Sequence, residues 1–418
     1  MLGLDSPELH RLVQPLRRPN NATNWLYLAV DYASLAAVIG TAVAFVHNHQ
    51  SWGVSTLWVA PVVLAAVFLV GALQHRLAGL GHEGAHYILF RNRWLNEAMS
   101  DLLCMFPLFS TTEQYRQIHL GHHEYVNDWE RDPELLNLGR TRMMDRFPMT
   151  KREFLYHFTV ALFVPKRLLR YMWDNIYVTA VGNGVHPYTL PTGEGPPLLF
   201  GLLRITTVLG VAYVAAMIGL MGYLSHYGST LSMAVTPLAM LAAAAICIAL
   251  LPRKWFFSSR IRPVYSNKIT SFLRLAYLTA LEAVLAWSCF VTGFEWGVYF
   301  WLFWMLPLFT MFPYLMLLRD LFQHANADEG RLTNSRAILC NPVLRWAMFI
   351  YGQDLHVTHH LFPFVPHYRL PALHRLLMAN CEEYSRDVVE TQGIFRGHSP
   401  LPTLLDVISP RPTPGNLS

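Results

Sequence analysis

Residues 57–86 read LWVAPVVLAAVFLVGALQHRLAGLGHEGAH, and this stretch decides the fold of the chain. Its first part, Leu57–Leu73, contains no charged residue and approaches the length of a membrane-spanning helix. If that helix continues at about 1.5 Å per residue, it places His82 about 13 Å beyond Leu73. We therefore expect a membrane helix that carries histidines just outside the bilayer.

The composition of the whole chain agrees with a membrane protein. Of 418 residues, 53% are hydrophobic and only 14% are charged, whereas a soluble domain has about a quarter charged residues. An ordinary soluble enzyme and a disordered chain are both disfavoured. The formal net charge is +5, and the 19 histidines are the unusual component. Five scattered cysteines without a CxxC pair indicate neither a disulfide framework nor a thiolate metal site: Cys104, Cys247, Cys289, Cys340 and Cys381.

Apolar stretches of about the length that a membrane helix needs recur along the chain. They predict an all-α polytopic membrane protein with about six transmembrane helices, or four at minimum if the hairpin Leu198–Leu251 or Leu275–Leu318 is re-entrant. A further stretch, Leu155–Pro165, is too short to cross and is expected to lie in the membrane interface. The expected spans are Trp25–Val46, Leu57–Leu73, Leu198–Leu224, Leu231–Leu251, Leu275–Phe294 and Val298–Leu318.

Lysine and arginine are confined to one side of these spans. If both termini are cytoplasmic, no outer loop contains a basic residue, as the positive-inside rule requires. The outer loops are then His47–Thr56, Ser225–Thr230 and Glu295–Gly297.

This topology divides the chain into three regions. Residues 1–24 are expected to form a cytoplasmic tail without a cleavable signal peptide. Residues 25–378 form the membrane domain, with a cytoplasmic helical cap made of 74–197 and 319–378. Residues 379–418 form a tail that is partly disordered, because its end is rich in proline.

Histidines form three groups, all on the cytoplasmic side of this topology. Positions i, i+3 and i+4 of a helix share one face, so each group directs two or three imidazoles the same way. His324 lies about 9 Å beyond the sixth span if that helix continues. Nine imidazoles are too many for one metal ion and suit two, although spacing alone does not choose among Fe, Zn, Cu and Ni. The groups are HxxxH at His82 and His86, HxxHH at His119, His122 and His123, and HxxHH at His356, His359 and His360.

These motifs and their surroundings resemble the membrane fatty acid desaturase and hydroxylase superfamily. The first group is followed by FRNRWLN at 90–96, the second is preceded by YRQI at 115–118, and the third continues as LFPFVPHYRLPALH at 361–374. The resemblance covers about residues 25–378. It implies two non-haem iron ions that activate O2 and abstract hydrogen from an unactivated C–H bond of a lipid-like chain. It implies the ligand and catalytic set His82, His86, His119, His122, His123, His324, His356, His359 and His360.

One position departs from the pattern of the stearoyl-type members. Those members have an asparagine four residues before an extra ligand histidine, and this chain has Asp320 before His324. Asp320 is therefore expected to make a carboxylate or water-mediated contact with the metals. The spacing of the irons and the reaction outcome stay open.

Acidic and basic residues near the motifs have two interpretations each. Metal-bound imidazoles usually donate their other N–H to an acceptor, and the nearby acids either accept it or are solvated loop charges. Arg319 and Arg369 pair with such acids or with a lipid headgroup. Glu282, inside the fifth span, is either a functional group or has a polar partner on another helix. The acids in question are Glu83, Asp128, Asp132 and Asp354.

The reaction also needs electrons, and the chain shows no motif of a fused electron carrier. We expect a separate donor of the ferredoxin, rubredoxin or cytochrome b5 type. Basic residues of the cap either dock this acidic partner or anionic lipid, or only set the topology. They are Arg140, Arg142, Arg146, Lys151, Arg152, Lys166, Arg167 and Arg170.

The leading hypothesis is an O2-dependent acyl-lipid desaturase in a bacterial inner membrane, with a cytoplasmic active site and no nucleic-acid partner. A hydroxylase or ketolase acting on an alkyl, sphingolipid or carotenoid chain would use the same histidine motifs. A membrane metal transporter or sensor is disfavoured, because it should place ionisable residues along its spans. The spans hold only Asp31, Arg204 and Glu282.

Overall fold

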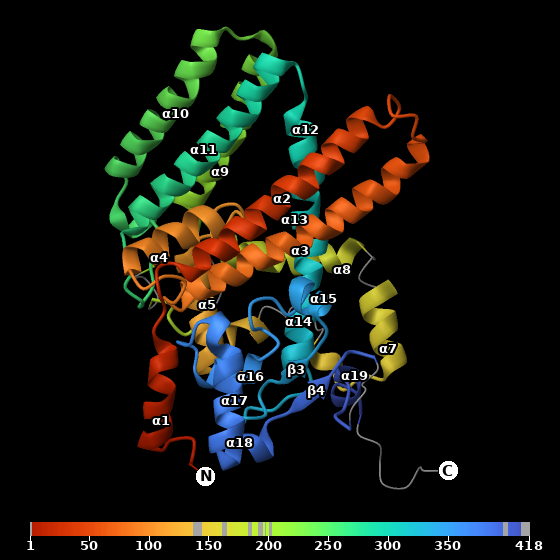
Figure 1. Cartoon of the computed structure of the whole chain (residues 1–418). Helices are drawn as coiled ribbons and strands as arrows, with labels where there is room; N and C mark the ends of the chain where they lie inside the picture. The colour runs from red at the N-terminus through yellow and green to blue at the C-terminus, as the bar shows by residue number, and fades with distance from the viewer. Residues whose placement is uncertain are drawn as a thin grey trace.

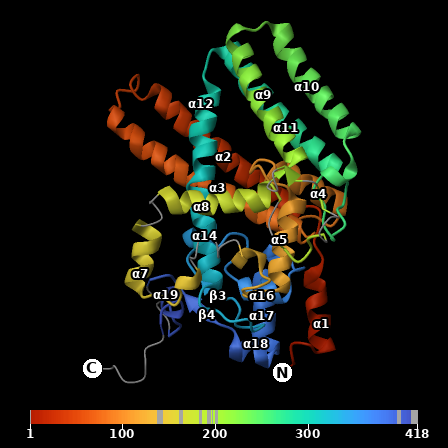
Figure 2. The same cartoon turned by 180° about the vertical axis from the view of Figure 1, so that it is seen from behind.

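The computed structural model describes residues 2–136, 144–160, 165–182, 186–190, 195–196, 198–199, 203–395 and 400–410. Long apolar helices form one end of the molecule, and a cap of shorter elements forms the other (Figures 1 and 2). The first and last helices of the described chain, α1 (Pro7–Val13) and α19 (Leu404–Val407), both lie in the cap (Figure 1).

Six helices of the described chain are long and apolar enough to cross a membrane, which confirms an all-α polytopic membrane protein. Their side chains face outward to an unusual degree: only 11% of the residues in the most apolar part of α9 are buried. So much exposed apolar surface is stable only in contact with lipid. The spans are α2 (Thr23–Asn48), α3 (Val59–Ala85), α9 (Ile205–Tyr227), α10 (Thr230–Leu250), α11 (Asn267–Thr292) and the sixth span Trp296–His324, which joins α12 (Trp296–Phe300), α13 (Leu306–Phe309) and α14 (Met311–His324).

The remaining elements are short. β1 and β2 pair antiparallel, and β3 and β4 pair parallel. The helices are α4 (Arg93–Ser100), α5 (Thr112–Glu124), α7 (Lys151–Leu155), α8 (Pro165–Asn175), α15 (Pro342–Ala347), α16 (His356–Leu361), α17 (Leu370–Asn380) and α18 (Glu382–Asp387), and the strands are β1 (Leu198–Leu199), β2 (Leu203–Arg204), β3 (Ala337–Leu339) and β4 (Glu390–Gln392).

Two span boundaries differ from those expected. The third span starts at Ile205 rather than Leu198, because the residues before it pair as the β1–β2 hairpin. The fifth span starts at Asn267 rather than Leu275, with the hydroxyl of Ser266 accepting a hydrogen bond from the first turn. Its polar first turns are helical although they lack the hydropathy of a membrane segment. The expected interfacial stretch Leu155–Pro165 lies partly outside the described residues, and the proline-rich end from 411 onward lies wholly outside them.

Helices α3 and α14 run from the membrane part into the cap and cross each other closely (Figure 1). A Cβ atom at Gly71 of α3 would lie 2.6 Å from Met311 Cβ and 3.0 Å from the backbone nitrogen of Phe312. Only glycine therefore permits this approach, as at other close crossings of membrane helices. The two helices enter the cap side by side.

A buried ion pair joins α2, α3 and the segment before α16. Arg76 Nε donates to Asp31 Oδ1 at 2.7 Å, and Arg76 Nη2 donates to the hydroxyl of Tyr351 at 2.8 Å. The Tyr351 hydroxyl donates in turn to the other Asp31 oxygen. Because each polar atom has a partner, the charges are tolerated next to the membrane, and Asp31 and Arg76 have a structural role there.

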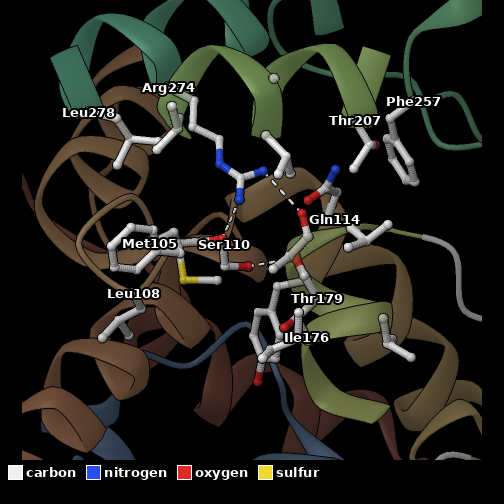
Figure 3. A pocket seen from close by; sticks show the side chains of 18 of the residues that line it. Met105, Leu108, Ser110, Gln114, Ile176, Thr179, Thr207, Phe257, Arg274 and Leu278 are labelled. Atoms are coloured by element: carbon white, nitrogen blue, oxygen red, sulfur yellow. Dashed lines mark hydrogen bonds between the residues drawn. The ribbon is translucent and has the colours of Figure 1, made fainter. Parts of the chain in front are cut away.

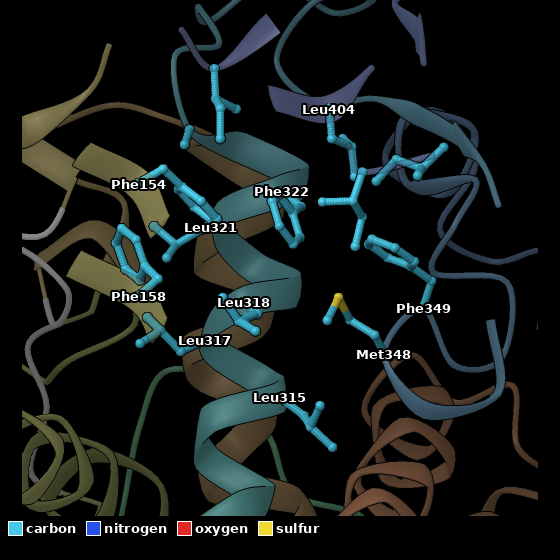
Figure 4. Close-up of a cluster of buried hydrophobic side chains, with 14 of the residues drawn as sticks. Phe154, Phe158, Leu315, Leu317, Leu318, Leu321, Phe322, Met348, Phe349 and Leu404 are labelled. Atoms are coloured by element: carbon cyan, nitrogen blue, oxygen red, sulfur yellow. The ribbon is translucent and has the colours of Figure 1, made fainter. Parts of the chain in front are cut away.

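The largest apolar cluster of the cap surrounds the end of α14 (Figure 4). Phe322 of α14 lies among Phe154, Phe349 and Leu404, and all four are almost fully buried. Leu404 belongs to the region that we expected to be a separate tail, and strand β4 of the same region pairs with β3. Residues after 378 therefore pack against the cap, through Leu404 and strand β4.

Truncation of Phe322 should loosen this cluster. Phe322→Ala removes a buried ring and is expected to lower the free energy of unfolding by about 3–5 kcal/mol. Thermal unfolding of the purified protein in detergent measures the effect. Phe395→Ala is the control, because that side chain is 56% exposed and should change the midpoint little. Equal midpoints for the two variants would contradict the importance of this cluster.

Candidate metal centre

Five histidines from three helices form the first cluster. One ring nitrogen of each lies within 4.8 Å of the corresponding nitrogens of the others. Helices α3, α5 and α16, far apart in sequence, supply these residues, and four of the five are buried. The cluster consists of His82 of α3, His86 directly after the end of α3, His119 and His123 of α5, and His359 of α16.

The second cluster contains the remaining four histidines of the expected set. Its ring nitrogens also lie within 4.8 Å of one another. Its members are His122 of α5, His324 at the end of α14, and His356 and His360 of α16. The structure thus brings together all nine histidines singled out in the sequence and divides them into two groups.

The two HxxHH motifs serve the two clusters in opposite ways. In α5 the i and i+4 residues face the first cluster and His122, at i+3, faces the second. In α16 the i and i+4 residues face the second cluster and His359 faces the first. Residues i and i+4 lie one turn apart on nearly the same line, whereas i+3 is rotated away from that line. Each motif therefore stands between the two clusters.

The ring nitrogens point at one another rather than at protein acceptors. His119 Nε2 lies 2.9 Å from His86 Nε2 and 3.1 Å from His123 Nε2. A proton between two imidazoles satisfies one pair, but it cannot satisfy a group of converging lone pairs. In the described chain, the buried Nε2 of His122 has no hydrogen-bond partner. A cation placed between the rings would satisfy these atoms, so the donor set fits a bound metal ion at each cluster.

Acceptors outside the clusters fix the orientation of several rings. His122 Nδ1 lies 2.9 Å from Asp132 Oδ2, and His324 Nδ1 lies 3.0 Å from the carbonyl oxygen of Asn334. His119 Nδ1 lies 3.4 Å from Glu134 Oε1. Each contact holds the proton on Nδ1 and leaves Nε2 directed into its cluster, as the second ring nitrogen of a metal ligand requires.

Burial keeps most of these imidazoles neutral. It lowers the pKa well below the ordinary value of 6.5 at His86, His123, His356, His359 and His360. At His122, burial also acts to lower the pKa, but the carboxylates of Asp132 and Glu134 outweigh it and raise the pKa to about 9. Neutral imidazoles offer the lone pairs that metal binding needs, and a metal ion would have to displace a proton only at His122.

Comparison with known proteins supports this reading of the site. The sequence profile described as fatty acid desaturase matches residues 61–256 and 235–391, a region that includes all nine histidines. The chain belongs to the fatty acid desaturase family.

One curated protein that is similar to this chain is dihydrorhizobitoxine desaturase from Bradyrhizobium elkanii. It is 27% identical over 230 residues, which cover 53% of this chain and 60% of that protein. The chain therefore spans about 60% of the length of the curated relative that it matches.

Of the four acids expected to support the ligands, two lie near a cluster histidine and two pair with an arginine instead. Asp132 contacts His122, and Glu83 Oε1 lies 3.8 Å from His82 Nδ1. Asp128 instead pairs with Arg131, and Asp354 pairs with Arg345 at 2.9 Å.

Asp320, the expected additional metal contact, lies outside both clusters. Its Oδ1 accepts from Arg319 Nη2 at 2.7 Å, and Arg319 Nη1 lies 3.2 Å from His75 Nε2. Arg319 thus binds one oxygen of the carboxylate that was expected to reach the metals. Arg369, the other arginine with an open assignment, donates to the carbonyls of Pro15 and Leu16.

Three contacts of the centre were missed in the sequence. Glu134 follows the second motif closely, and its proximity to Asp132 was an available signal. Asn334 contributes only its backbone carbonyl, which leaves no signature in residue type. Gln353 Nε2 lies 3.3 Å from His82 Nε2, which no motif indicates.

A fully buried arginine positions the first histidine pair. Arg116 donates to Glu97 Oε2 at 2.6 Å and to Glu113 Oε2 at 2.8 Å, and also to the carbonyls of Gly84 and Ala85 at 3.0 and 2.9 Å. It thereby ties the end of α3 to α4 and α5. Because two carboxylates and two carbonyls surround one cation, its burial is compensated.

A cavity of about 1020 Å³ adjoins the histidine clusters. At one end it is lined by Glu134, next to His119, and by Asp320. From there it extends between α9, α10 and α11, past the apolar side chains of Met105 and Leu108 (Figure 3). Its size and lining are typical of a site for an apolar ligand.

The cap residues expected to dock a carrier are only partly described. Arg140 and Arg142 lie outside the described residues. Lys151 pairs with Asp406 at 2.6 Å, although both side chains are about half exposed.

Glu282, the acidic residue inside the fifth span, lies partly buried on α11.

Asp132→Asn should weaken metal binding, because the amide no longer holds the proton of His122 Nδ1 with a charged acceptor. We expect the affinity for Fe²⁺ to fall by about 10- to 100-fold. Titration of the iron-loaded protein with a chelator measures this. Asp128→Asn is the matched control, since that carboxylate pairs with Arg131 at the surface. Identical iron retention in both variants would exclude a supporting role of Asp132.

Proposed function

We propose that this chain is an O2-dependent oxidoreductase that desaturates an acyl or alkyl chain at a di-iron centre. The observation that carries the proposal is that a largely apolar cavity between membrane helices reaches Glu134, which contacts His119 of the first histidine cluster. Family membership supports it. The name of the curated relative describes a desaturase as well.

The nine histidines would hold two iron ions, which supply the activation of O2 and hydrogen abstraction from a C–H bond when bound. The protein holds the ligands in position from outside. Asp132 and the Asn334 carbonyl fix the tautomers of His122 and His324, and Arg116 fixes the end of α3. Tyr115 stacks on His119 with ring centroids 5.3 Å apart and also lines the cavity. Because these contacts already hold the imidazole rings in position, the rings would need to move little when a metal ion binds.

The cavity would bind the chain to be oxidised. Its apolar wall includes Phe312, Pro313 and Met316 on the way to Asp320, which lies beside the second cluster on α14. An alkyl chain that enters the cavity exchanges contact with water for contact with apolar side chains. The narrow path then lets only a few of its carbon atoms lie near the metal end. A desaturase needs such a restriction to act on one particular carbon–carbon bond of the chain.

Electrons would come from a separate carrier protein of the ferredoxin, rubredoxin or cytochrome b5 type. We place the cap on the cytoplasmic side of a bacterial inner membrane, because the loops at the far end of the spans contain no lysine or arginine. Exposed basic residues of the cap such as Lys166 would attract an acidic carrier.

Expression in a bacterial host that supplies electron carriers, followed by mass spectrometry of total lipids, tests the proposal. Loss of two hydrogens from an acyl or alkyl chain supports desaturation. Addition of one oxygen would instead indicate hydroxylation at the same centre, and addition of one oxygen with loss of two hydrogens would indicate ketolation. An unchanged lipid profile despite iron-loaded protein would contradict both.

Removal of one ligand from either cluster should abolish this reaction. We expect His122→Ala and His359→Ala each to reduce product below detection and to lower bound iron, because each deletes a ligand of a different cluster. Product yield and iron content are measured on membranes with equal amounts of inserted protein. His226→Ala is the control, because this exposed histidine lies at the end of α9. Full activity of either ligand variant would refute the assignment.

A further inference from the structure

A further group of metal-ligating side chains lies at the end of the spans that is far from the histidine clusters. It combines the imidazole of His226, the thiol of Cys289 and the carboxylate of Glu295, and one ligand atom of each lies within 4.8 Å of the other two. His226 lies at the end of α9, Cys289 in the last turn of α11, and Glu295 directly before α12. Figure 1 shows the linker from α11 to α12 at the end of the molecule opposite the cap.

Packing between α9 and α11 brings the first two ligands together. The hydroxyl of Tyr213 on α9 lies 2.6 Å from Thr279 Oγ1 on α11. Further along the same two helices, Met221 of α9 and Ala286 of α11 belong to one buried apolar cluster. The imidazole and the thiol therefore stand on packed helices, which hold their positions more precisely than loops do.

A sharp turn after α11 brings the third ligand to the same place. Gly293 caps α11 in the left-handed conformation, with φ of 67°, and its N–H donates to the carbonyl of Cys289 at 2.7 Å. Glycine adopts this conformation at little cost because it has no Cβ atom. The carboxylate of Glu295 then lies 3.9 Å from His226 Nε2.

The negative charge of Glu295 has no lysine or arginine nearby to balance it. The loops at this end of the spans, residues 47–56, 225–230 and 295–297, contain no basic residue and no other acidic one. Among the described residues, the carboxylate has one ion-pair contact, with His226, and both side chains are about half exposed. A separation of 3.9 Å is too long for a hydrogen bond, so the carboxylate stays open to a cation.

The three donors and their spacing suit a zinc ion. Zinc binds sulfur at about 2.3 Å and imidazole nitrogen or carboxylate oxygen at about 2.0–2.2 Å. Two such nitrogen and oxygen ligands of a tetrahedral ion lie roughly 3.4 Å apart, so His226 and Glu295 need to approach each other by only about half an ångström. The thiol disfavours Mg²⁺ and Ca²⁺, which bind oxygen ligands.

Exposed aromatic side chains surround this group and indicate that it lies at the membrane surface. Tyr223 and Tyr227 follow α9 to its end, and Trp296 follows Glu295 directly; all three are exposed. Tyrosine and tryptophan are enriched where lipid meets water. Metal ions dissolved in the water on this side of the membrane can therefore reach the three ligands.

We propose that His226, Cys289 and Glu295 bind a zinc ion, with water as the fourth ligand. Cys289 binds as a thiolate, and its proton passes to the solvent when the zinc–sulfur bond forms. The ion ties the end of α9 to the turn between α11 and the sixth span. Because the ligands come from three separate elements, the scattered cysteines form no metal motif in the sequence. The site is remote from the histidine clusters, so its loss leaves their iron content unchanged, and the proposal does not rest on the proposed function.

Cobalt substitution of the purified, iron-loaded full chain in detergent, with its thiols reduced, tests the proposal. Co²⁺ can replace Zn²⁺ in a tetrahedral site, and its bond to a thiolate gives a charge-transfer band in the near ultraviolet. We expect one Co²⁺ per chain to produce this band and Zn²⁺ to remove it, because zinc binds such sites more tightly. The histidine clusters contain no sulfur and cannot give the band. Its absence overturns the proposal.

A pair of cysteine variants identifies the thiolate. Cys289→Ser should abolish the band. Cys247→Ser is the matched control, because this exposed cysteine of α10 lies outside the group and its loss should leave the band intact. A band that survives Cys289→Ser, or that is lost equally in Cys247→Ser, overturns the proposal.

Where Cys289→Ser does not fold, Glu295→Gln decides, because this side chain is exposed. We expect the affinity for Co²⁺ to fall by at least about 10-fold, since loss of a residue that only supports a metal ligand already costs about 10- to 100-fold. Glu130→Gln, which changes an exposed carboxylate of the cap, should leave the affinity unchanged. Equal affinities in these two variants overturn the proposal.

Discussion

The candidate metal centre depends on the rigidity of two helices that pass from the membrane into the cap. An α-helix satisfies its own backbone hydrogen bonds, so α3 and α14 can leave the lipid phase without losing their direction. Their close crossing at Gly71 fixes the relative height at which His82, His86 and His324 emerge. Helices α5 and α16 then need only pack against this fixed base. Loosening of the crossing would displace ligands of both clusters together.

Two buried arginines each hold a segment that carries functional residues. The Asp31–Arg76–Tyr351 pair fixes the segment before α16, and Arg116 fixes the end of α3. In both cases the charges are balanced by neighbours within the chain.

Local pattern was enough to predict six membrane helices and the grouping of the nine histidines, because hydropathy and helical spacing are properties of neighbouring residues. It failed where tertiary packing decides. The polar start of α11 is helical because its side chains find partners, as Arg274 does on the carbonyl of Ala180. Leu404 joins the core of the cap although nothing in its own segment requires this. The supporting carbonyl of Asn334 has no sequence signature, since every residue type has one.

The opposite use of the two HxxHH motifs has a consequence for how the protein would take up metal ions. Helices α5 and α16 each contribute to both clusters, so an ion captured at either one restrains the motion of both helices. A second ion would then bind to rings that are already ordered, so its binding would cost less conformational entropy of the two helices. Uptake of the pair should be cooperative, with few molecules at intermediate iron concentration containing a single ion.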